Sequence, residues 1–578
     1  MLTISDNISN YYTLLSEKNN LAYITIDEFK VDTNLLKQKN YFDYLKYQAI
    51  PIKKTAHKVI IATANVTKNN IQKINDYFKN DFNLPIEIVV ISRQAISKTL
   101  SQKFSKKLTH DITNKRFDVD PVHSASYSFS LTEKIVLIIA ITLIIAALCW
   151  HLSIGIFIGS LLLSMGTVVF MAYKMGLTLR LTRWPQKKTV KSLVLDSDLP
   201  TYTILIPVLR EKKITISALL ASIERIDYDK SKLDVKLLVE EDDVNTIEII
   251  NTFNLPWYFE VLIVPPGLPR SKPRACNYGL YLAFGEYLTI FDAEDRPDPD
   301  QLKQALKCFS ENDKETVCIQ AALNFYNYKE NLLTKLFTIE FSHWFDFFVP
   351  ALVFLKAPVP LGGTSNHFKT PALLKLAGWD PYIGTEDADI GIRIYRLRLK
   401  TNCITSTTYE EANSNLLNWF RQRVRWNKGY MQTYLVNMRD PIKMIKEIGW
   451  VKFINFQYFV GGNVFIQLAN LPLWIFLIAT YFHLVTKGLE PNSKVLFFTT
   501  WYDFLIANSI LLMSEFYSVY KRRLYSLLPY VPLKLFYWLL MSFAGYYAIF
   551  ELLIRPGYWY KTEHGFSKQG KNTDIPIR

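Results

Sequence analysis

Long apolar runs constrain the fold of this chain more than any other feature. Residues Ile135 to Trp150 include no charged side chain, and Leu152 to Tyr173 is nearly as apolar, with a short turn near His151 between the two runs. Each run approaches the roughly 20 residues that an α-helix needs to cross a bilayer, where backbone polar groups must be hydrogen-bonded within the chain. The sequence therefore predicts a transmembrane helical hairpin over residues 131–174, with the lipid bilayer as a partner.

Basic residues flank this hairpin on both sides. Lys and Arg precede it and follow it, at Lys103, Lys106, Lys107, Lys115, Arg116 and Lys134 and then at Lys174, Arg180, Arg183, Lys187, Lys188 and Lys191. Short basic flanks mark the cytoplasmic side of a membrane protein. We therefore expect the next domain to lie in the cytoplasm.

Further apolar runs near the C-terminus predict transmembrane helices over residues 450–555. The runs cover about 453–484, 495–513 and 527–554, and the segment Asn470-Leu471-Pro472 is expected to break the first into two helices. An even number of crossings would leave residues 556–578, a basic segment, as a cytoplasmic tail or a gating-like loop.

The aromatic-rich stretch Phe337 to Leu355 is interrupted by Glu340, His343 and Asp346. This pattern favours a helix lying at the membrane interface over one crossing it, and the alternative is an ordinary buried helix.

Composition excludes several other classes. The chain has 578 residues, of which 49% are hydrophobic and 21% charged, and its formal charge is +15. Because Lys and Arg are scattered and form no single basic run, we predict no nucleic-acid partner; a membrane surface and a nucleotide diphosphate account for the charge. The five cysteines show no CxxC pair, so neither a disulfide framework nor a zinc site is indicated, and no cleavable signal peptide is evident.

Two soluble domains are predicted. Residues 1–125 read as a small α/β domain, with a strand over 58–64, a helix over 69–78 and a strand over 86–91. Residues 195–440 open with a strand over 202–208, a helix over 214–225 and a strand over 235–239. Strand, helix and strand at this spacing predict a βαβ unit and a parallel sheet.

A further strand over 287–291 ends directly in the acids Asp292, Glu294 and Asp295. Ligands of open α/β sheets bind at the carboxyl ends of the strands, and carboxylates there suit a hard cation such as Mg²⁺ or Mn²⁺ that bridges a diphosphate. The alternative is a solvated loop, because Asp and Pro are ordinary turn residues.

Four acidic or polar clusters follow one another along the chain in the order expected for residues that line one cleft. They are Glu241-Asp242-Asp243, Asp292 to Asp295, Thr385-Glu386-Asp387 and Gln422-Arg423-Val424-Arg425-Trp426. Here the chain resembles the processive members of glycosyltransferase family 2, such as cellulose and hyaluronan synthases. The resemblance implies an α/β GT-A-type catalytic domain, with a Rossmann-like mixed sheet, embedded between transmembrane helices. It also implies a bacterial inner (cytoplasmic) membrane location with the catalytic domain in the cytoplasm.

The resemblance carries over to single residues. It implies that Asp242 contacts the uracil of a UDP-sugar donor, that Lys272 neutralises phosphate, and that Asp292 is the first acid of the family's D-x-D element. Glu294 stands where the second acid is expected, with Asp295 next to it, so either completes the metal site. The alternative for Asp242 and Lys272 is surface solvation.

The remaining motif residues match the acceptor side of such a site. Asp387, with Glu386 beside it, matches the general base of the T-E-D motif, although acids are also favoured at a helix start by the helix dipole. Gln422, Arg425 and Trp426 match the Q-x-x-R-W signature, in which Arg425 pairs with the diphosphate and Trp426 offers a platform to the acceptor sugar. A core Trp with a solvated Arg is the alternative.

The N-terminal domain is similar to the later half of the N-terminal domain of type II secretion ATPases. Some members of that family bind cyclic di-GMP, but the arginine-and-glycine motif that opens them is not visible here. Three roles stay open for this domain: a structural scaffold, a contact with another protein, or the binding of a cyclic dinucleotide.

The resemblance thus implies a membrane glycosyltransferase that inverts the anomeric centre, uses a UDP-sugar, extends a polysaccharide or glycan acceptor and moves its product through its own helices. Two alternatives stay open: a non-processive transferase to a lipid carrier, and a catalytically silent membrane receptor or secretion component.

Overall fold

The computed structural model describes residues 4–25, 31–126, 199–487 and 491–555, together with Gly557 and scattered residues between 135 and 176. The chain divides into two compact units. Unit 1 comprises Met1–Val119, Leu193–Ala293 and Asn366–Pro381; unit 2 comprises Asp120–Ser192, Glu294–Ser365 and Tyr382–Arg578. More than half of the predicted hairpin over 131–174, and all of the tail over 556–578 except Gly557, lie outside the described residues.

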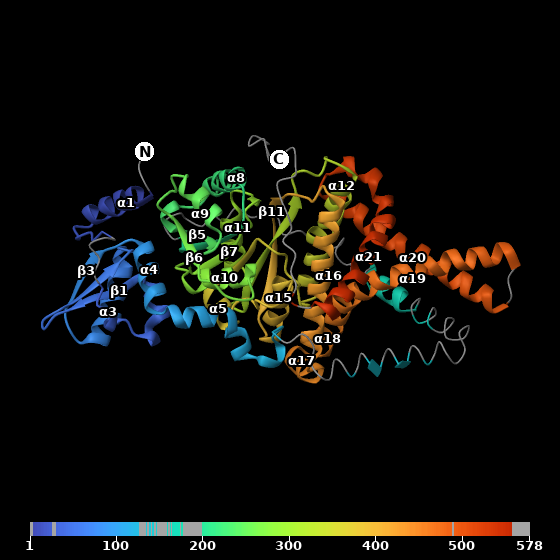
Figure 1. Cartoon of the computed structure of the whole chain (residues 1–578), viewed down its shortest axis with the longest axis horizontal. Coiled ribbons are helices and arrows are strands. Elements are labelled where there is room, and N and C mark those ends of the chain that lie inside the picture. The colour runs from blue at the N-terminus through green and yellow to red at the C-terminus, as the bar shows by residue number, and fades with distance from the viewer. Residues whose placement is uncertain are drawn as a thin grey trace. The chain divides into compact units, whose positions relative to one another are not determined.

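Unit 1 begins with a small α/β module, residues 4–119, which we call the N-terminal module (Figure 1). Its sheet has the order β1-β2-β3, formed by Ala49–Lys54, Val59–Thr63 and Ile86–Val90. β2 and β3 are parallel and are joined by α3, Lys68–Phe82, whose Ile74 and Phe78 are buried. The predicted strand, helix and strand are therefore confirmed.

The other helices of the N-terminal module were not predicted from sequence. They are α1 (Ile4–Lys18), α2 (Tyr41–Tyr47), α4 (Arg93–Lys103) and α5 (Ser105–Val119). α4 buries the polar Arg93 and Ser97 beside the apolar Ile96 and Leu100, so apolar periodicity alone marks its buried face only weakly.

The rest of unit 1 is built on five strands in the order β6-β5-β4-β7-β10. They span Phe259–Val264, Leu233–Glu240, Tyr202–Val208, Tyr287–Ile290 and Asn366–Lys369. β4, β5, β6 and β7 pair in parallel, and β10 is antiparallel to β7. The crossovers contain α8 (Lys213–Glu224), α9 (Val244–Asn251) and α10 (Lys272–Tyr281). The predicted βαβ unit is confirmed, and the carboxyl ends of the parallel strands share one edge of the sheet.

Unit 2 contributes three strands in the order β9-β11-β8. β9, Thr316–Phe325, is parallel to β11, Lys400–Glu410, and the short β8, Arg296–Pro297, is antiparallel to β11. α11 (Gln301–Ser310) follows β8, and α15 (Glu386–Arg396) precedes β11.

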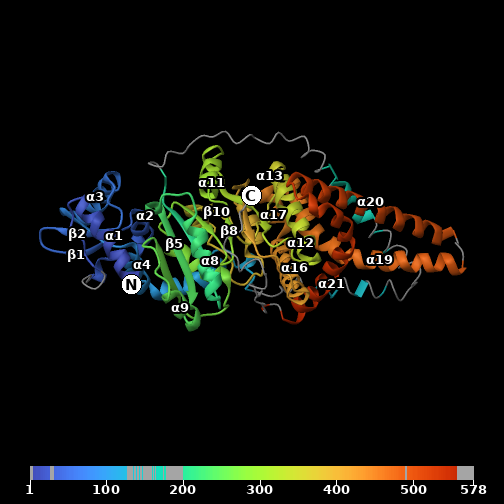
Figure 2. The ribbon, with the colours of Figure 1, turned by 90° about the horizontal axis from the view of Figure 1, so that it is seen from above.

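The remaining part of unit 2 is helical. Its main elements are α12 (Leu332–His343), α13 (Val349–Phe354), α16 (Leu416–Met438), α17 (Pro441–Ile448), α18 (Trp450–Phe456), α19 (Gly462–Lys487), α20 (Pro491–Lys521) and α21 (Lys534–Ile554). Figure 2 shows α19 and α20 running side by side. Among the described residues, three helical stretches have the length and composition to cross a membrane: Leu332–Phe354, Trp450–Ala479 and Tyr525–Ile554.

The structure bears on two predictions about these helices. Pro472 lies inside α19, so the expected break at this proline is wrong; the irregular turn falls earlier, at Gln457–Gly461. Neighbouring helices can hold a proline-containing helix together, and α19 is bonded to α21 by Asn470 Nδ2, 3.3 Å from Ser542 Oγ. The stretch Leu332–Phe354 is mostly buried within unit 2, as the alternative of a buried helix expects.

Candidate active site

At the carboxyl edge of the unit 1 sheet, a lysine and an aspartate lie in contact. Lys272 is the first residue of α10, Asp292 follows β7, and Lys272 Nζ lies 2.5 Å from Asp292 Oδ1. Both side chains are partly exposed. The structure therefore brings together two residues predicted for nucleotide binding, and places a cation where phosphate oxygens would be attracted.

The three acids after β5 have different surroundings. Asp243 caps α9: its carboxylate accepts from Thr246 N at 3.4 Å and from Arg210 N at 2.5 Å. Asp242 instead pairs with Arg270 and keeps 64% of its side chain exposed. Asp243 therefore has a structural task, whereas Asp242 stands at the surface at the end of the strand.

Glu240, the last residue of β5, is mostly buried. Burial raises the pKa of its carboxyl, although Arg274, whose Nη1 lies 3.5 Å away, and Arg270 oppose that rise. The edge that carries Asp242 is thus lined by both signs of charge.

The acids after β7 differ in burial. Glu294 is partly exposed, whereas Asp295 is buried and its Oδ2 accepts from Thr364 Oγ1 at 2.5 Å. Thr364 belongs to the small-residue loop 362–365, which is also held by Gly362 N donating to Gln320 Oε1 at 2.8 Å. Asp295 thereby fixes this loop.

The same loop meets Asp387. Asp387 is the second residue of α15 and is buried, as is Glu386, so the predicted helix start is confirmed. A Cβ built on Gly363 would lie 3.6 Å from Asp387 Oδ2, so the carboxylate lies directly against the loop backbone. Loop 362–365 therefore contacts both Asp295 and Asp387, the two acids that the sequence placed at one site.

Asp387 also influences two neutral neighbours. The pKa of the Cys318 thiol is raised, first by its burial and then by the negative charge of Asp387. The pKa of the Tyr430 hydroxyl is raised by burial and by Asp387 and Glu340. Neither group competes with Asp387 as a base near neutral pH.

α16 contains Gln422, Arg425 and Trp426, which at spacings of three and four residues lie along one face of that helix. It packs on the start of α15 at Gly429, where a Cβ would lie 2.6 Å from Thr385 Cγ2. Gly384 N donates to Gln432 Oε1 at 3.2 Å across the same junction. Because residue 429 is a glycine without a Cβ, α16 can approach the acidic motif this closely.

Trp426 is held by three residues for which no role in a site was predicted. The Arg423 guanidinium lies 4.7 Å from the centroid of the Trp426 ring, and the rings of Phe337 and Phe341 lie 6.1 Å from it. Arg423 itself donates to both oxygens of Glu340, at 2.8 and 2.7 Å. A bidentate pair of this kind fixes orientation as well as charge.

The candidate metal ligands fit a hard cation in type but do not form a cage. Within the ranges that the structure describes, no three His, Cys, Asp or Glu side chains gather as a metal-binding group. Mg²⁺ is usually held by one or two carboxylates together with substrate phosphates and water, so a pair such as Asp292 and Glu294 is chemically sufficient.

Comparisons with known proteins match two regions of the chain. The profile of glycosyl transferase family 2 matches residues 203–365, that of glycosyl transferase family group 2 matches residues 287–550, and the MshEN domain matches residues 19–110. The chain thus carries glycosyltransferase family 2 domains and an N-terminal MshEN domain, and the catalytic fold is GT-A-like with a mixed sheet. The more specific resemblance to cellulose and hyaluronan synthases stays a prediction.

Three individual proteins are similar to parts of this chain. The probable glycosyltransferase YdaM of Bacillus subtilis (strain 168) is 24% identical over 274 residues, which cover 46% of this chain and 64% of YdaM. The mannosyltransferase PcManGT of Pyrobaculum calidifontis, solved with GDP-Man and Mn²⁺, is 19% identical with a TM-score of 0.44 and covers 68% of this chain and 99% of its own. Residues 1–349 of TarS from S. aureus are 14% identical with a TM-score of 0.31, covering 62% and 93%.

Proposed function

We propose that the protein is a membrane-embedded, inverting glycosyltransferase that transfers a sugar from a nucleotide-sugar donor, a UDP-sugar, to a growing polysaccharide. The observation that supports this best is the contact of one loop, residues 362–365, with both Asp295 and Asp387. Asp292 is three residues from Asp295, so their Cα atoms are at most about 11 Å apart whatever the backbone conformation. Chain connectivity and this one loop therefore link Asp292, which we assign to the donor, with Asp387, which we assign as the general base.

In this mechanism Asp387 is the general base. As the acceptor hydroxyl oxygen attacks the anomeric carbon, its proton passes to the Asp387 carboxylate, the new C–O bond forms, and the bond to the diphosphate breaks on the opposite face. The nucleoside diphosphate leaves with the bonding electrons. A positioned carboxylate contributes about 100- to 10,000-fold to such a step.

Unit 1 would hold the donor. Lys272 pairs with diphosphate oxygens in place of its contact with Asp292. Asp242 accepts a hydrogen bond from the nucleobase of the donor. A carboxylate can accept from a ring N–H of uracil or of guanine, so Asp242 alone does not distinguish a UDP-sugar from a GDP-sugar.

A divalent cation, Mg²⁺ or Mn²⁺, would neutralise the leaving diphosphate when bound. Asp292 and Glu294, both partly exposed, are the side chains that we assign to it. Asp295 we assign to the loop, because it is buried and bonded to Thr364.

Unit 2 would hold the acceptor. We assign Arg425 to the diphosphate and Trp426 to the terminal sugar of the acceptor, and Gln422 shares their face of α16. The packing of Trp426 among Phe337, Phe341 and Arg423 supports a platform of fixed orientation. The apolar helices of unit 2 support a multi-pass protein of a bacterial inner membrane that passes its product through these helices.

The test is the release of nucleoside diphosphate by the purified full-length protein in nanodiscs, screened over UDP- and GDP-sugars with Mg²⁺ or Mn²⁺. We expect release with a UDP-sugar, loss on chelation, and long products on a gel. A single added sugar would favour transfer to a lipid carrier, and no release with any donor would favour a silent receptor.

We infer that the MshEN match makes a cyclic dinucleotide the first small ligand to test on the N-terminal module. Calorimetric titration of the full-length protein with cyclic di-GMP checks this, and an absence of heat would leave a scaffold or a protein contact as the module's role.

A further inference from the structure

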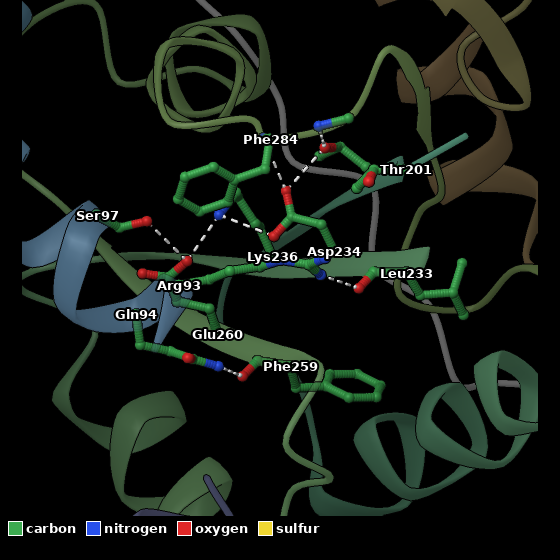
Figure 3. A network of polar contacts seen from close by, with 12 residues as sticks. Arg93, Gln94, Ser97, Thr201, Leu233, Asp234, Lys236, Phe259, Glu260 and Phe284 are labelled. Atoms are coloured by element: carbon green, nitrogen blue, oxygen red, sulfur yellow. Dashed lines mark hydrogen bonds and ion pairs between the residues drawn. The ribbon is translucent and has the colours of Figure 1, made fainter. Parts of the chain in front are cut away.

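The N-terminal module is attached to the catalytic domain of unit 1 by a buried polar network (Figure 3). Arg93, the first residue of α4, donates from its guanidinium to Leu233 O at 2.8 Å and to Ser231 O at 3.1 Å. Gln94 Nε2 donates to Trp257 O at 2.8 Å. α4 is thereby bonded to the backbone at the start of β5 and just before β6.

The network continues into the core of the domain. Ser97 Oγ, also from α4, donates to Glu260 Oε2 at 3.1 Å, and Glu260 pairs with the fully buried Lys236 at 2.6 Å (Figure 3). Lys236 pairs in turn with Asp234 at 3.1 Å, whose Oδ2 accepts from Phe284 N at 3.0 Å. Burial alone would lower the pKa of Lys236, but Asp234 and Glu260 outweigh burial and raise it. The module therefore supplies one member of a charged network that reaches the segment just after α10.

The module also contacts α10 directly. Tyr41 Oη, from α2, donates to Tyr281 O at the last residue of α10, at 2.6 Å. Asn277 Nδ2, in the middle of α10, donates to Ile112 O of α5 at 3.0 Å. Both bonds are buried, so neither is weakened by competition with bulk water.

The amide of Asn277 has further partners on the opposite side. Its Nδ2 donates to Trp379 O at 2.9 Å and its Oδ1 accepts from Trp379 N at 2.9 Å. Gly378, with a φ of +65°, makes this possible, because a Cβ there would lie 2.3 Å from Asn277 Oδ1. Asn277 thus joins α10 at once to α5 and to the segment after α14, Thr370–Lys375.

A third contact lies nearer the start of α10. Arg274 Nε donates to Thr113 Oγ1 of α5 at 3.4 Å, and Arg274 Nη1 lies 3.5 Å from Glu240 at the end of β5. Arg274, Asn277 and Tyr281 are spaced three and four residues apart, so they lie along one face of the helix. The module therefore contacts α10 from its first turn to its last residue.

α10 begins with Lys272, the residue that pairs with Asp292. A ten-residue α-helix behaves as a short rigid rod of about 15 Å, so fixing one face of it also fixes its first residue. We propose that the N-terminal module is a positioning element of the donor site: through Tyr41, Ile112 and Thr113 it sets α10 and hence the place of Lys272. This inference rests on the proposed function, because it is the donor diphosphate that Lys272 would bind.

The test compares two Tyr→Phe variants of the full-length protein that each lose one buried hydroxyl. Tyr41→Phe removes the hydrogen bond to α10. Tyr44→Phe is the matched control, because its hydroxyl accepts from Lys37 N at 2.9 Å within the module. We expect Tyr41→Phe to raise the donor KM about three- to tenfold with kcat unchanged at saturating donor, as one lost hydrogen bond predicts, and Tyr44→Phe to leave KM unchanged. Asn277→Ala should raise KM in the same way.

Equal donor KM values in the wild type, Tyr41→Phe and Asn277→Ala would overturn the inference, since a module that only adds stability would lower Tm in both Tyr variants without moving KM. A second readout is independent of activity. Hydrogen exchange of the α10 amides should quicken in Tyr41→Phe and not in Tyr44→Phe, and unchanged exchange would also overturn it. If the wild type releases no nucleoside diphosphate from any donor, the proposed function fails while the exchange measurement still decides whether the module sets α10.

Discussion

Lys272 Nζ lies 2.5 Å from Asp292 Oδ1, at the junction between the start of α10 and the end of β7. The two side chains therefore offset each other's charge in this contact. In the proposed function, a diphosphate would compete with Asp292 for Lys272.

Replacing Lys272 should weaken donor binding more than turnover. A charge-assisted hydrogen bond contributes about 1.5–3 kcal/mol, so Lys272→Met should raise the donor KM about ten- to a hundredfold, with a smaller rise for Lys272→Arg. Steady-state release of nucleoside diphosphate measures this. Lys375→Met, at an exposed position of α14, is the control and should behave as the wild type. Unchanged donor affinity in Lys272→Met would remove this residue from the site.

At the junction of α15 and α16, we expect alanine substitutions of two glycines to differ in their effect on activity. In Gly429→Ala the new Cβ would meet Thr385 Cγ2 at 2.6 Å and Thr385 N at 2.7 Å, whereas in Gly384→Ala the nearest atoms lie at an ordinary 3.5 Å. Overpacking costs about 1–3 kcal/mol and should displace α16 from the acidic motif. We expect Gly429→Ala to lose most activity and Gly384→Ala to retain it. Equal activity of the two variants, at equal Tm, would contradict the role given to this junction.

The buried His367 should make the folded protein less stable in acid. It is buried in β10, with its Nδ1 2.7 Å from Tyr202 Oη, and burial lowers its pKa from 6.5 to about 3. The unfolded chain therefore binds this proton below about pH 6.5 while the folded chain does not until about pH 3, so stability falls as the pH is lowered through that window. The loss should be about 2 kcal/mol at pH 5 relative to pH 7.5.

The measurement for His367 is Tm against pH for the wild type and two variants. His367→Gln should flatten the curve between pH 7.5 and 5, and His57→Gln, at an exposed position, should keep the slope of the wild type. A slope that persists in His367→Gln would assign the acid sensitivity to other groups.

Local patterns explain which parts of this structure could be predicted. Continuous apolar runs predicted the strands β4, β5 and β7, and a cluster of acids predicted the start of α15. Gln422, Arg425 and Trp426 were recognised through the family signature that they match. These signals lie within about a dozen residues of one another. Together with the resemblance of the four clusters, they indicated the same glycosyltransferase family 2 domains that the family models match.

Contacts between distant segments could not be predicted in this way. Asn277 and Ile112 are 165 residues apart, and Arg423 and Glu340 are 83 apart, so nothing in either local sequence indicates the partner. α4 was missed because the face that it buries mixes polar and apolar residues, with Arg93 and Ser97 buried beside Ile96 and Leu100. Its hydrogen bonds to β5 and β6 stand where a purely apolar face would show a clear periodicity. Gly429 reads as an ordinary helix residue until the approach of Thr385 is known.

The central claim, that Asp387 acts as the base of a sugar transfer, is tested most directly by nucleoside diphosphate release from Asp387→Asn. Asp313→Asn, which changes an exposed acid paired with Lys400, is the matched control. We predict that Asp387→Asn lowers kcat about 100- to 10,000-fold while the affinity for nucleoside diphosphate and the Tm stay at wild-type values. Turnover of Asp387→Asn at the rate of Asp313→Asn would contradict the account.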